Sequence, residues 1–169
     1  MEETTGKAAD RFGMEEDEDT LLGKFLTFPL GKEEYGLEIR HVTEIVGIQK
    51  ITEVPDMPQY VKGVINLRGK VIPVMDVRTR FTLAEKPYDD HTCIVVVNIN
   101  DSSVGLIVDT VSEVISIPDG NIDPPPSVTK GDSSRFIKGL GKVGDTVVIL
   151  LDIGQLLFEE SAALAAMAS

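Results

Sequence analysis

Residues 61–76 read VKGVINLRGKVIPVMD, and residues 137–152, IKGLGKVGDTVVILLD, form a weaker copy of them. The two stretches are related by a constant offset of 76, and both end in an aspartate. In each, β-branched residues flank a short polar segment that contains glycine, which is typical of a β-hairpin. We therefore expect two equivalent hairpins, and we assign turn-forming roles in the first one to Gly63 and Gly69.

The duplication continues toward the N-terminus. Residues 35–46, YGLEIRHVTEIV, recur as residues 104–115, VGLIVDTVSEVI, at an offset of 69. Because this offset is seven residues smaller than the offset of 76, the second copy must carry a longer loop before residue 136. Three consecutive prolines at 124–126 favour loop backbone there. Two copies are too few for a solenoid, so the duplication predicts two similar subdomains of one compact unit.

Short strands dominate the rest of the pattern. Helices are expected only directly after Asp76 and Asp152, where a carboxylate can accept hydrogen bonds from the unpaired N–H groups of a first helical turn. Short strands at regular spacing, without long alternating helices, indicate an all-β fold with short helices and not a parallel α/β sheet. Further hairpins are predicted from strands 25–30 and 35–39 and, in the second copy, from strands 93–99 and 104–108.

The predicted organisation follows the duplication. We expect a first barrel subdomain over residues 21–88, a second over residues 89–158, and the end of a C-terminal helix over residues 159–169, with exchange of strands between the subdomains permitted. Residues 1–20 contain eight acidic and two basic residues and no apolar run. This composition predicts a disordered acidic tail.

Charge and hydropathy limit the possible cellular locations of the protein and the classes of partner it could bind. The 169-residue chain has a formal net charge of −12, which argues against nucleic acid and anionic lipid as partners. Residues 1–20 lack the hydrophobic stretch of a secretory signal, and no run of about 18 apolar residues is present to span a bilayer. We therefore expect a cytoplasmic protein without direct membrane insertion.

Residues suited to catalysis or metal binding are few and well separated. His41 and His91 are the only histidines and Cys93 is the only cysteine, so no metal site is predicted. Cys93 begins an apolar run, where a small buried side chain is expected. Phosphate-binding and dinucleotide-binding glycine motifs are absent, and we predict no catalytic residue and no cofactor.

Two alternatives remain open at this stage. The duplicated Asp76 and Asp152 could form a hydrolase site in which two carboxylates share one proton, as in aspartic proteases. However, Val77 and Ile153 follow them in place of the Ser or Thr of those enzymes. A small β-barrel could also bind nucleic acid, although this chain has no tryptophan and an excess of acid.

The copies differ most clearly at Arg68, because the equivalent residue is Gly144. An arginine beside a tight turn is either a solvated charge or an exposed donor for a partner protein. The surrounding sequence resembles the CheW family, the coupling proteins of bacterial chemotaxis, from about Phe25 to Leu157. The residues that carry the resemblance are Gly36, the segment 42–46, Gly63, Asn66, Leu67, Arg68, Gly69, Pro73 and Asp76.

The resemblance implies two interlocked five-stranded SH3-like barrels related by internal duplication. It also implies a non-enzymatic adaptor that holds the histidine kinase CheA against the cytoplasmic tips of methyl-accepting chemoreceptors. Such a protein would be cytoplasmic and recruited to receptor clusters at the membrane.

The resemblance further implies two binding surfaces. A receptor-facing groove at the junction of the barrels would include Val42, Cys93, Val111 and Val114, with Arg68 near its edge. The kinase would meet an edge of the first barrel around Ile39, Glu44 and Val46.

Overall fold

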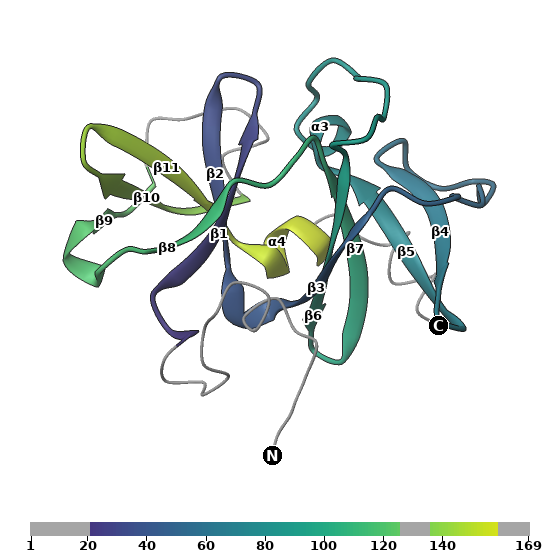
Figure 1. Ribbon diagram of the computed structural model, residues 1–169, viewed down its shortest axis with the longest axis horizontal. Coiled ribbons are helices and arrows are strands. Elements are labelled where there is room, and N and C mark those ends of the chain that lie inside the picture. Colours follow the sequence, from purple (N-terminus) through teal and green to yellow (C-terminus); the bar gives the residue numbers. More distant parts are fainter. Residues whose placement is uncertain (1–20, 126–135, 159–169) are drawn as a thin grey trace.

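The computed structural model describes residues 21–125 and 136–158, which form two β-sheets side by side with a short helix between them (Figure 1). This arrangement confirms the predicted all-β fold with short helices. The expectations for residues 1–20 and 159–169 lie outside the described residues.

One sheet has five strands in the order β3-β6-β7-β5-β4. A bridge between Thr52 and Val64 brings the segment after β3 onto β4, so the two edges of the sheet meet. The barrel therefore closes on itself, which leaves little unpaired edge. Its strands are β3 (Val42–Gly47), β4 (Val61–Leu67), β5 (Lys70–Asp76), β6 (Cys93–Ile99) and β7 (Ser102–Val108).

The other sheet has six strands in the order β8-β1-β2-β11-β10-β9. This sheet has one strand more than the five predicted for each barrel, because β9, only two residues long, pairs with β10. Each predicted sequence half, 21–88 and 89–158, thus contributes strands to both sheets. The strands are β1 (Lys24–Leu30), β2 (Glu33–Glu38), β8 (Glu113–Ser116), β9 (Ile122–Asp123), β10 (Ile137–Val143) and β11 (Thr146–Leu151), and the helices of the chain are η1 (Ile39–His41), α3 (Val77–Arg80), η2 (Asp119–Asn121) and α4 (Ile153–Phe158).

Two parallel strand pairs interlock the halves of the sequence. Strand β5 pairs with β7, with Val74 opposite Gly105, and β11 pairs with β2, with Leu150 opposite Gly36. Each copy thus pairs its last strand with the second strand of the other copy. A Cβ atom added at Gly105 would lie 2.7 Å from Cγ2 of Ile94, so the close approach of neighbouring side chains explains a duplicated glycine.

The two glycines assigned to turns behave differently. Arg68 and Gly69 form the β4–β5 turn with φ of 52° and 87°, which confirms the turn role of Gly69. The turn role predicted for Gly63 is wrong, because this residue lies within β4 beside a bulge. A Cβ atom there would lie 2.1 Å from the carbonyl oxygen of Thr52, so a close backbone approach requires glycine at this position.

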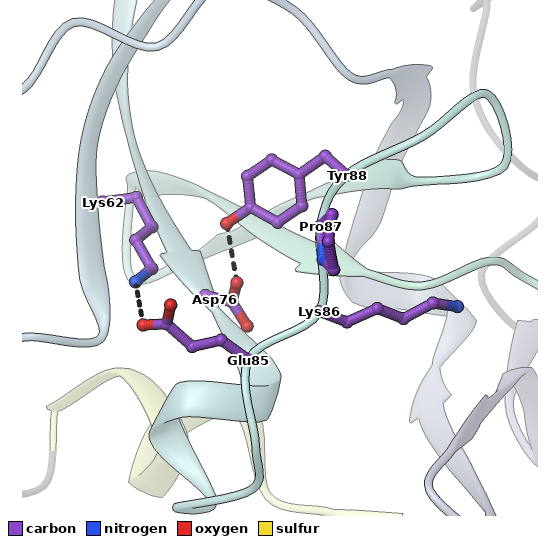
Figure 2. Close-up of a pocket in the computed structure, with 6 residues that line it drawn as sticks. All are labelled: Lys62, Asp76, Glu85, Lys86, Pro87 and Tyr88. Atoms are coloured by element: carbon purple, nitrogen blue, oxygen red, sulfur yellow. Dashed lines mark hydrogen bonds and ion pairs between the residues drawn. The ribbon is translucent and has the colours of Figure 1, made fainter.

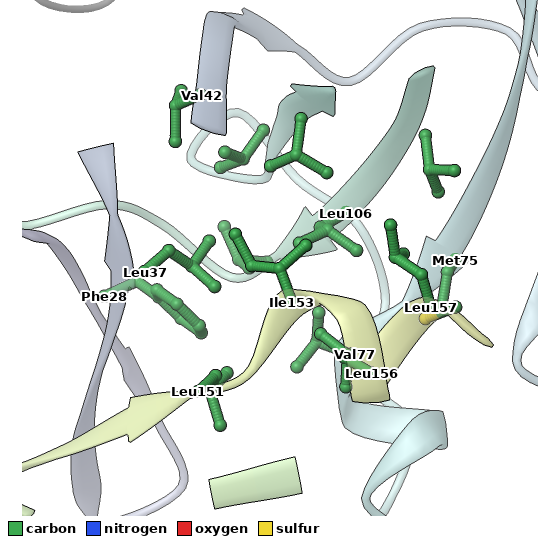
Figure 3. Packing of buried hydrophobic residues seen from close by; sticks show 14 of the residues in the cluster. Phe28, Leu37, Val42, Met75, Val77, Leu106, Leu151, Ile153, Leu156 and Leu157 are labelled. Carbon is green, nitrogen blue, oxygen red and sulfur yellow. The ribbon is translucent and has the colours of Figure 1, made fainter. Parts of the chain in front are cut away.

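The largest core cluster lies between the sheets. Figure 3 shows Ile153, Leu156 and Leu157 of α4 packed among side chains from both sheets, and all three are at most 4% exposed. Strand β6 is buried on both faces, because Val95 belongs to this cluster while Ile94 belongs to the separate core of the five-stranded barrel. The shared core therefore joins the two barrels into one packed unit.

Candidate functional site

The duplicated aspartates are helix caps. Asp76 Oδ1 accepts a hydrogen bond from the Thr79 N–H at 3.2 Å, at the start of α3. Asp152 Oδ1 accepts one from the Gln155 N–H at 3.0 Å, at the start of α4. The capping interpretation of both residues is confirmed, and it accounts for their duplication without catalysis.

A cleft of about 460 Å³ lies beside Asp76 and is shown in Figure 2. The Tyr88 hydroxyl donates to Asp76 Oδ2 at 2.6 Å, and Lys62 Nζ pairs with Glu85 at 3.2 Å. Burial and the neighbouring Asp76 carboxylate raise the pKa of Tyr88 above its ordinary value. The Tyr88–Asp76 hydrogen bond and the Lys62–Glu85 ion pair hold the loop before β6 against β5 and β4.

Candidate metal ligands are dispersed in the described part of the chain, where no group of three or more His, Cys, Asp or Glu side chains could hold a metal ion. His41 Nε2 lies 3.1 Å from a carboxylate oxygen of Glu38. In the same described ranges, no helix is long and apolar enough to cross a membrane.

An apolar patch is partly exposed where the two sheets meet. Cys93, Val111 and Val114, called the junction patch below, are half-buried against the core cluster between the sheets. Cys93 begins β6 of one sheet, Val114 lies on β8 of the other opposite Leu26, and Val111 lies in the connection to β8. Burial raises the pKa of the Cys93 thiol, although a backbone hydrogen bond from Val111 acts in the opposite direction. The thiol is therefore a protonated, weakly polar contact surface.

A second cleft, of about 380 Å³, adjoins the junction patch. Its walls include Pro29 of the β1–β2 hairpin and Thr110 after β7, so it opens between the two sheets. Arg78 Nε donates to both carboxylate oxygens of Asp109, at 3.0 and 2.9 Å, and fixes one wall. Because this wall is held by a bidentate ion pair, the groove at the junction is a preformed feature.

Two of the predicted contact residues belong to the core. Val42 is 5% exposed and Ile39 is 1% exposed, and both pack in the cluster between the sheets. Their side chains support the surfaces assigned to them from behind, and in this conformation they present almost no area to a partner. The expected involvement of these two residues in partner binding stays a prediction.

Arg68 and Glu44 form an ion pair that links the two predicted surfaces. The Arg68 guanidinium, on the β4–β5 turn, hydrogen-bonds the carboxylate of Glu44 on β3. Arg68 is 68% exposed, whereas Glu44 is 18% exposed. Val46 is half-buried on the same strand as Glu44, against the core of the five-stranded barrel. Arg68 thus lies with the residues assigned to the kinase, and it is not part of the junction patch.

Arg80 has a role that the sequence did not predict. Its guanidinium lies between the rings of Tyr60 and Phe136, 4.2 and 4.4 Å from their centroids. Its Nε donates to the carbonyl oxygen of Leu156 at 3.2 Å. Tyr60 and Phe136 are related by the offset of 76, as are Arg80 and Leu156, so the duplication itself was the signal that could have revealed this contact.

Comparisons with known proteins agree on one family. The model of the CheW-like domain matches residues 24–161. The chain is 39% identical to the chemotaxis protein CheW of Klebsiella aerogenes over 146 residues, which cover 86% of this chain and 88% of that protein. It is 36% identical to CheW of Helicobacter pylori, with 89% and 90% of the two chains covered.

A solved structure supports the same relationship. The crystal structure of the scaffolding protein TtCheW from Thermoanaerobacter tengcongensis matches with a TM-score of 0.73 and 40% identity. The match covers 79% of this chain and 86% of that one. Together with the two sheets, this likeness supports the expected pair of SH3-like barrels.

Proposed function

The chain belongs to the CheW family of chemotaxis scaffold proteins, and from this membership we propose that it couples the histidine kinase CheA to the cytoplasmic tips of methyl-accepting chemoreceptors. It would act without catalysis, in the cytoplasm, and be recruited to receptor clusters at the membrane. The duplicated aspartates cap α3 and α4, so their duplication does not require a catalytic role.

The junction patch carries the proposal for the receptor. Cys93, Val111 and Val114 come from both sheets and remain partly exposed next to a preformed groove. Exposed apolar side chains beside a rigid groove are the features of a protein-binding site. We assign the receptor tip to this surface, with Val42 supporting it from the core.

The edge of the five-stranded barrel is assigned to the kinase. Glu44 and Val46 lie on β3, which pairs only with β6 along its named length, and Ile39 packs beneath the start of that strand. Arg68 reaches the same edge through its pair with Glu44. We infer that this pair sets the position of the Glu44 carboxylate for the kinase and connects the turn at Arg68 to the same contact.

A capture experiment tests this assignment. Immobilised receptor-tip fragment should retain the chain alone, and should retain CheA only when the chain is present. Val111→Glu should abolish capture of the chain by the receptor fragment while CheA still binds, because a charge enters the apolar patch. The matched control, Val147→Glu, changes a 45% exposed valine on β11 and should leave both contacts intact. Equal capture of both variants by the receptor fragment would contradict the assignment.

A further inference from the structure

An exposed segment of the chain lies between α3 and β6. Residues 84–91, called the strap below, form neither helix nor strand. All of them are exposed, although the buried residues Phe81 and Thr92 lie on either side of the segment. Because the strap has neither regular backbone pairing nor a buried apolar side chain, its position depends on a few polar contacts.

The strap forms part of the wall of the groove at the junction of the sheets. Lys86, Asp89 and His91 line the cleft of about 380 Å³, together with Pro29 and Gly31 of the β1–β2 hairpin. Lys86 also lines the larger cleft shown in Figure 2. The strap thus lies between the two clefts, and any displacement of it changes the shape of the groove beside the junction patch.

A hydrogen bond to a buried carboxylate fastens the middle of the strap. The Tyr88 hydroxyl donates to Asp76 Oδ2 at 2.6 Å (Figure 2). Asp76 is 6% exposed, and its other oxygen caps α3, so the acceptor is fixed by the fold. A hydrogen bond to an ionised acceptor is about twice as strong as one between neutral groups. Tyr88 therefore provides a firm anchor.

Ion pairs fasten the strap less firmly. Lys62 Nζ pairs with Glu85, whose side chain is 63% exposed. Lys86 Nζ lies 3.9 Å from Asp109, which already forms the bidentate pair that fixes the groove wall. Exposed ion pairs contribute little to stability. The hydrogen bond of Tyr88 is thus the contact on which the position of the strap mainly depends.

We propose that Tyr88 is a positioning residue for receptor binding, which acts through Asp76 to hold the strap as a fixed wall of the groove. This inference rests on the proposed assignment of the receptor tip to the junction patch. Without the hydroxyl, the strap samples other positions, and only molecules whose groove keeps the bound shape can capture the receptor. Association then slows. Dissociation stays the same, because Tyr88 lines the other cleft and makes no contact in the groove.

Binding kinetics and NMR relaxation test the anchor in the intact chain. Tyr88→Phe removes only the hydroxyl, and water in the adjoining cleft can satisfy the Asp76 carboxylate, so the fold and the affinity for CheA should be retained. Association with an immobilised receptor-tip fragment should slow at least about fivefold, as expected when about a fifth of the molecules keep the bound shape. In the free protein, backbone order parameters of residues 84–91 should fall from about 0.85 to below about 0.6.

Two further variants separate the anchor from general effects on the fold. Tyr35→Phe removes the hydroxyl of a partly buried tyrosine on β2 and should leave the rates and order parameters unchanged. Pro87→Gly frees the backbone of the strap while Asp76 keeps its partner, and it should also slow association.

The outcomes distinguish this inference from the proposed function. If wild type does not bind the receptor fragment, the proposed function fails and this inference fails with it. If wild type binds, an unchanged association rate in the folded strap variants, or a loss of affinity caused by faster dissociation, would overturn this inference alone.

Discussion

At the scale of single residues, Arg68 combines unfavourable backbone geometry with exposure. Its φ of 52° lies in the left-handed region, which costs a residue with a side chain about 1–2 kcal/mol, and the second copy has glycine there at φ 58°. A type I′ turn strongly prefers Asn or Gly at this position. Retention of a strained, exposed arginine therefore favours a role in binding over a role in folding.

The first prediction follows from this conflict. Arg68→Ala should change the free energy of unfolding by no more than about 1 kcal/mol, because only an ion pair with an exposed partner is lost. The same variant should fail to support receptor control of CheA in a reconstituted phosphorylation assay, where loss of a hot-spot contact costs about 2 kcal/mol or more. Lys70→Ala, a change in the same β4–β5 hairpin as Arg68, removes one hydrogen bond to Ser103 of β7 and should behave like wild type. Full activity of both variants would return Arg68 to the interpretation of a solvated charge.

The second prediction concerns Glu38 and pH. Burial acts to raise the pKa of Glu38, but the hydrogen bond and charge of Lys138, together with Arg40 and His41, lower it below the usual 4.5. Because the pKa of Glu38 is lower in the folded state, ionised Glu38 stabilises the fold at any pH above its unfolded-state pKa. This stabilisation is lost as the pH falls through its folded-state pKa. Thermal unfolding should show wild type more stable than Glu38→Gln at about pH 7, with the difference vanishing near about pH 3. Glu33→Gln, an exposed change on the same strand, should show no such pH dependence.

At the scale of elements, α4 depends on its cap. The helix spans only Ile153–Phe158, so its own hydrogen bonds cannot stabilise it, yet it places Ile153, Leu156 and Leu157 between the sheets. A lost cap therefore loosens core packing as well as the helix.

The third prediction is that Asp152→Ala lowers the free energy of unfolding by about 1–2 kcal/mol, as expected for removal of an N-cap carboxylate. For a chain of this size the melting temperature should fall by about 2–8 °C. Asp145→Ala, at the exposed β10–β11 turn, should shift it by less than about 1 °C, as surface changes usually do. Equal melting of the two variants would show that the hydrogen bond to Gln155 contributes nothing.

Proline placement explains a difference between the two parallel ladders. Strand β5 begins its pairing with β7 at Val74, one residue after Pro73, whereas the β11–β2 ladder includes Ile149, the residue equivalent to Pro73. Proline lacks the N–H group that a ladder needs. The two barrels therefore differ in strand pairing at this position.

At the scale of the whole molecule, neither half of the sequence contains a complete sheet. Strands β1 and β2 pair with β8 and β11 of the second half, respectively, and β3 and β5 pair with β6 and β7 of that half. The fourth prediction is that residues 20–88 expressed alone are unfolded or aggregate, because their strands keep unpaired edges and exposed apolar faces.

Co-expression with residues 89–169 supplies the missing strands and should restore a folded complex. Amide spectra distinguish the outcomes, since an unfolded chain gives narrow dispersion and the complex should reproduce the wide dispersion of the intact protein. Well-dispersed amide resonances from residues 20–88 alone would contradict the interlocked arrangement.

Features that depend on neighbouring residues were readable from the sequence. The offsets of 76 and 69 identified the duplicated hairpins, and the two caps and the turn at Gly69 followed from local backbone chemistry. Gly63 was misread because its requirement comes from Thr52, a residue on another segment. A glycine that fits a turn and one that admits a close backbone approach look identical in the sequence.

Features that depend on pairing between distant segments were decided by the tertiary structure alone. The β2–β11 pairing and the contact between Arg68 and Glu44 each join residues more than 20 positions apart. Ile39 is buried in an interior that both sheets share. By itself, the sequence determined that this protein is a duplicated β fold with capped short helices, because strand periodicity, turns and caps are local. The separation of the junction patch and the β3 edge from the buried core came only from the exchange of strands between the copies, because burial depends on which faces the whole fold brings together.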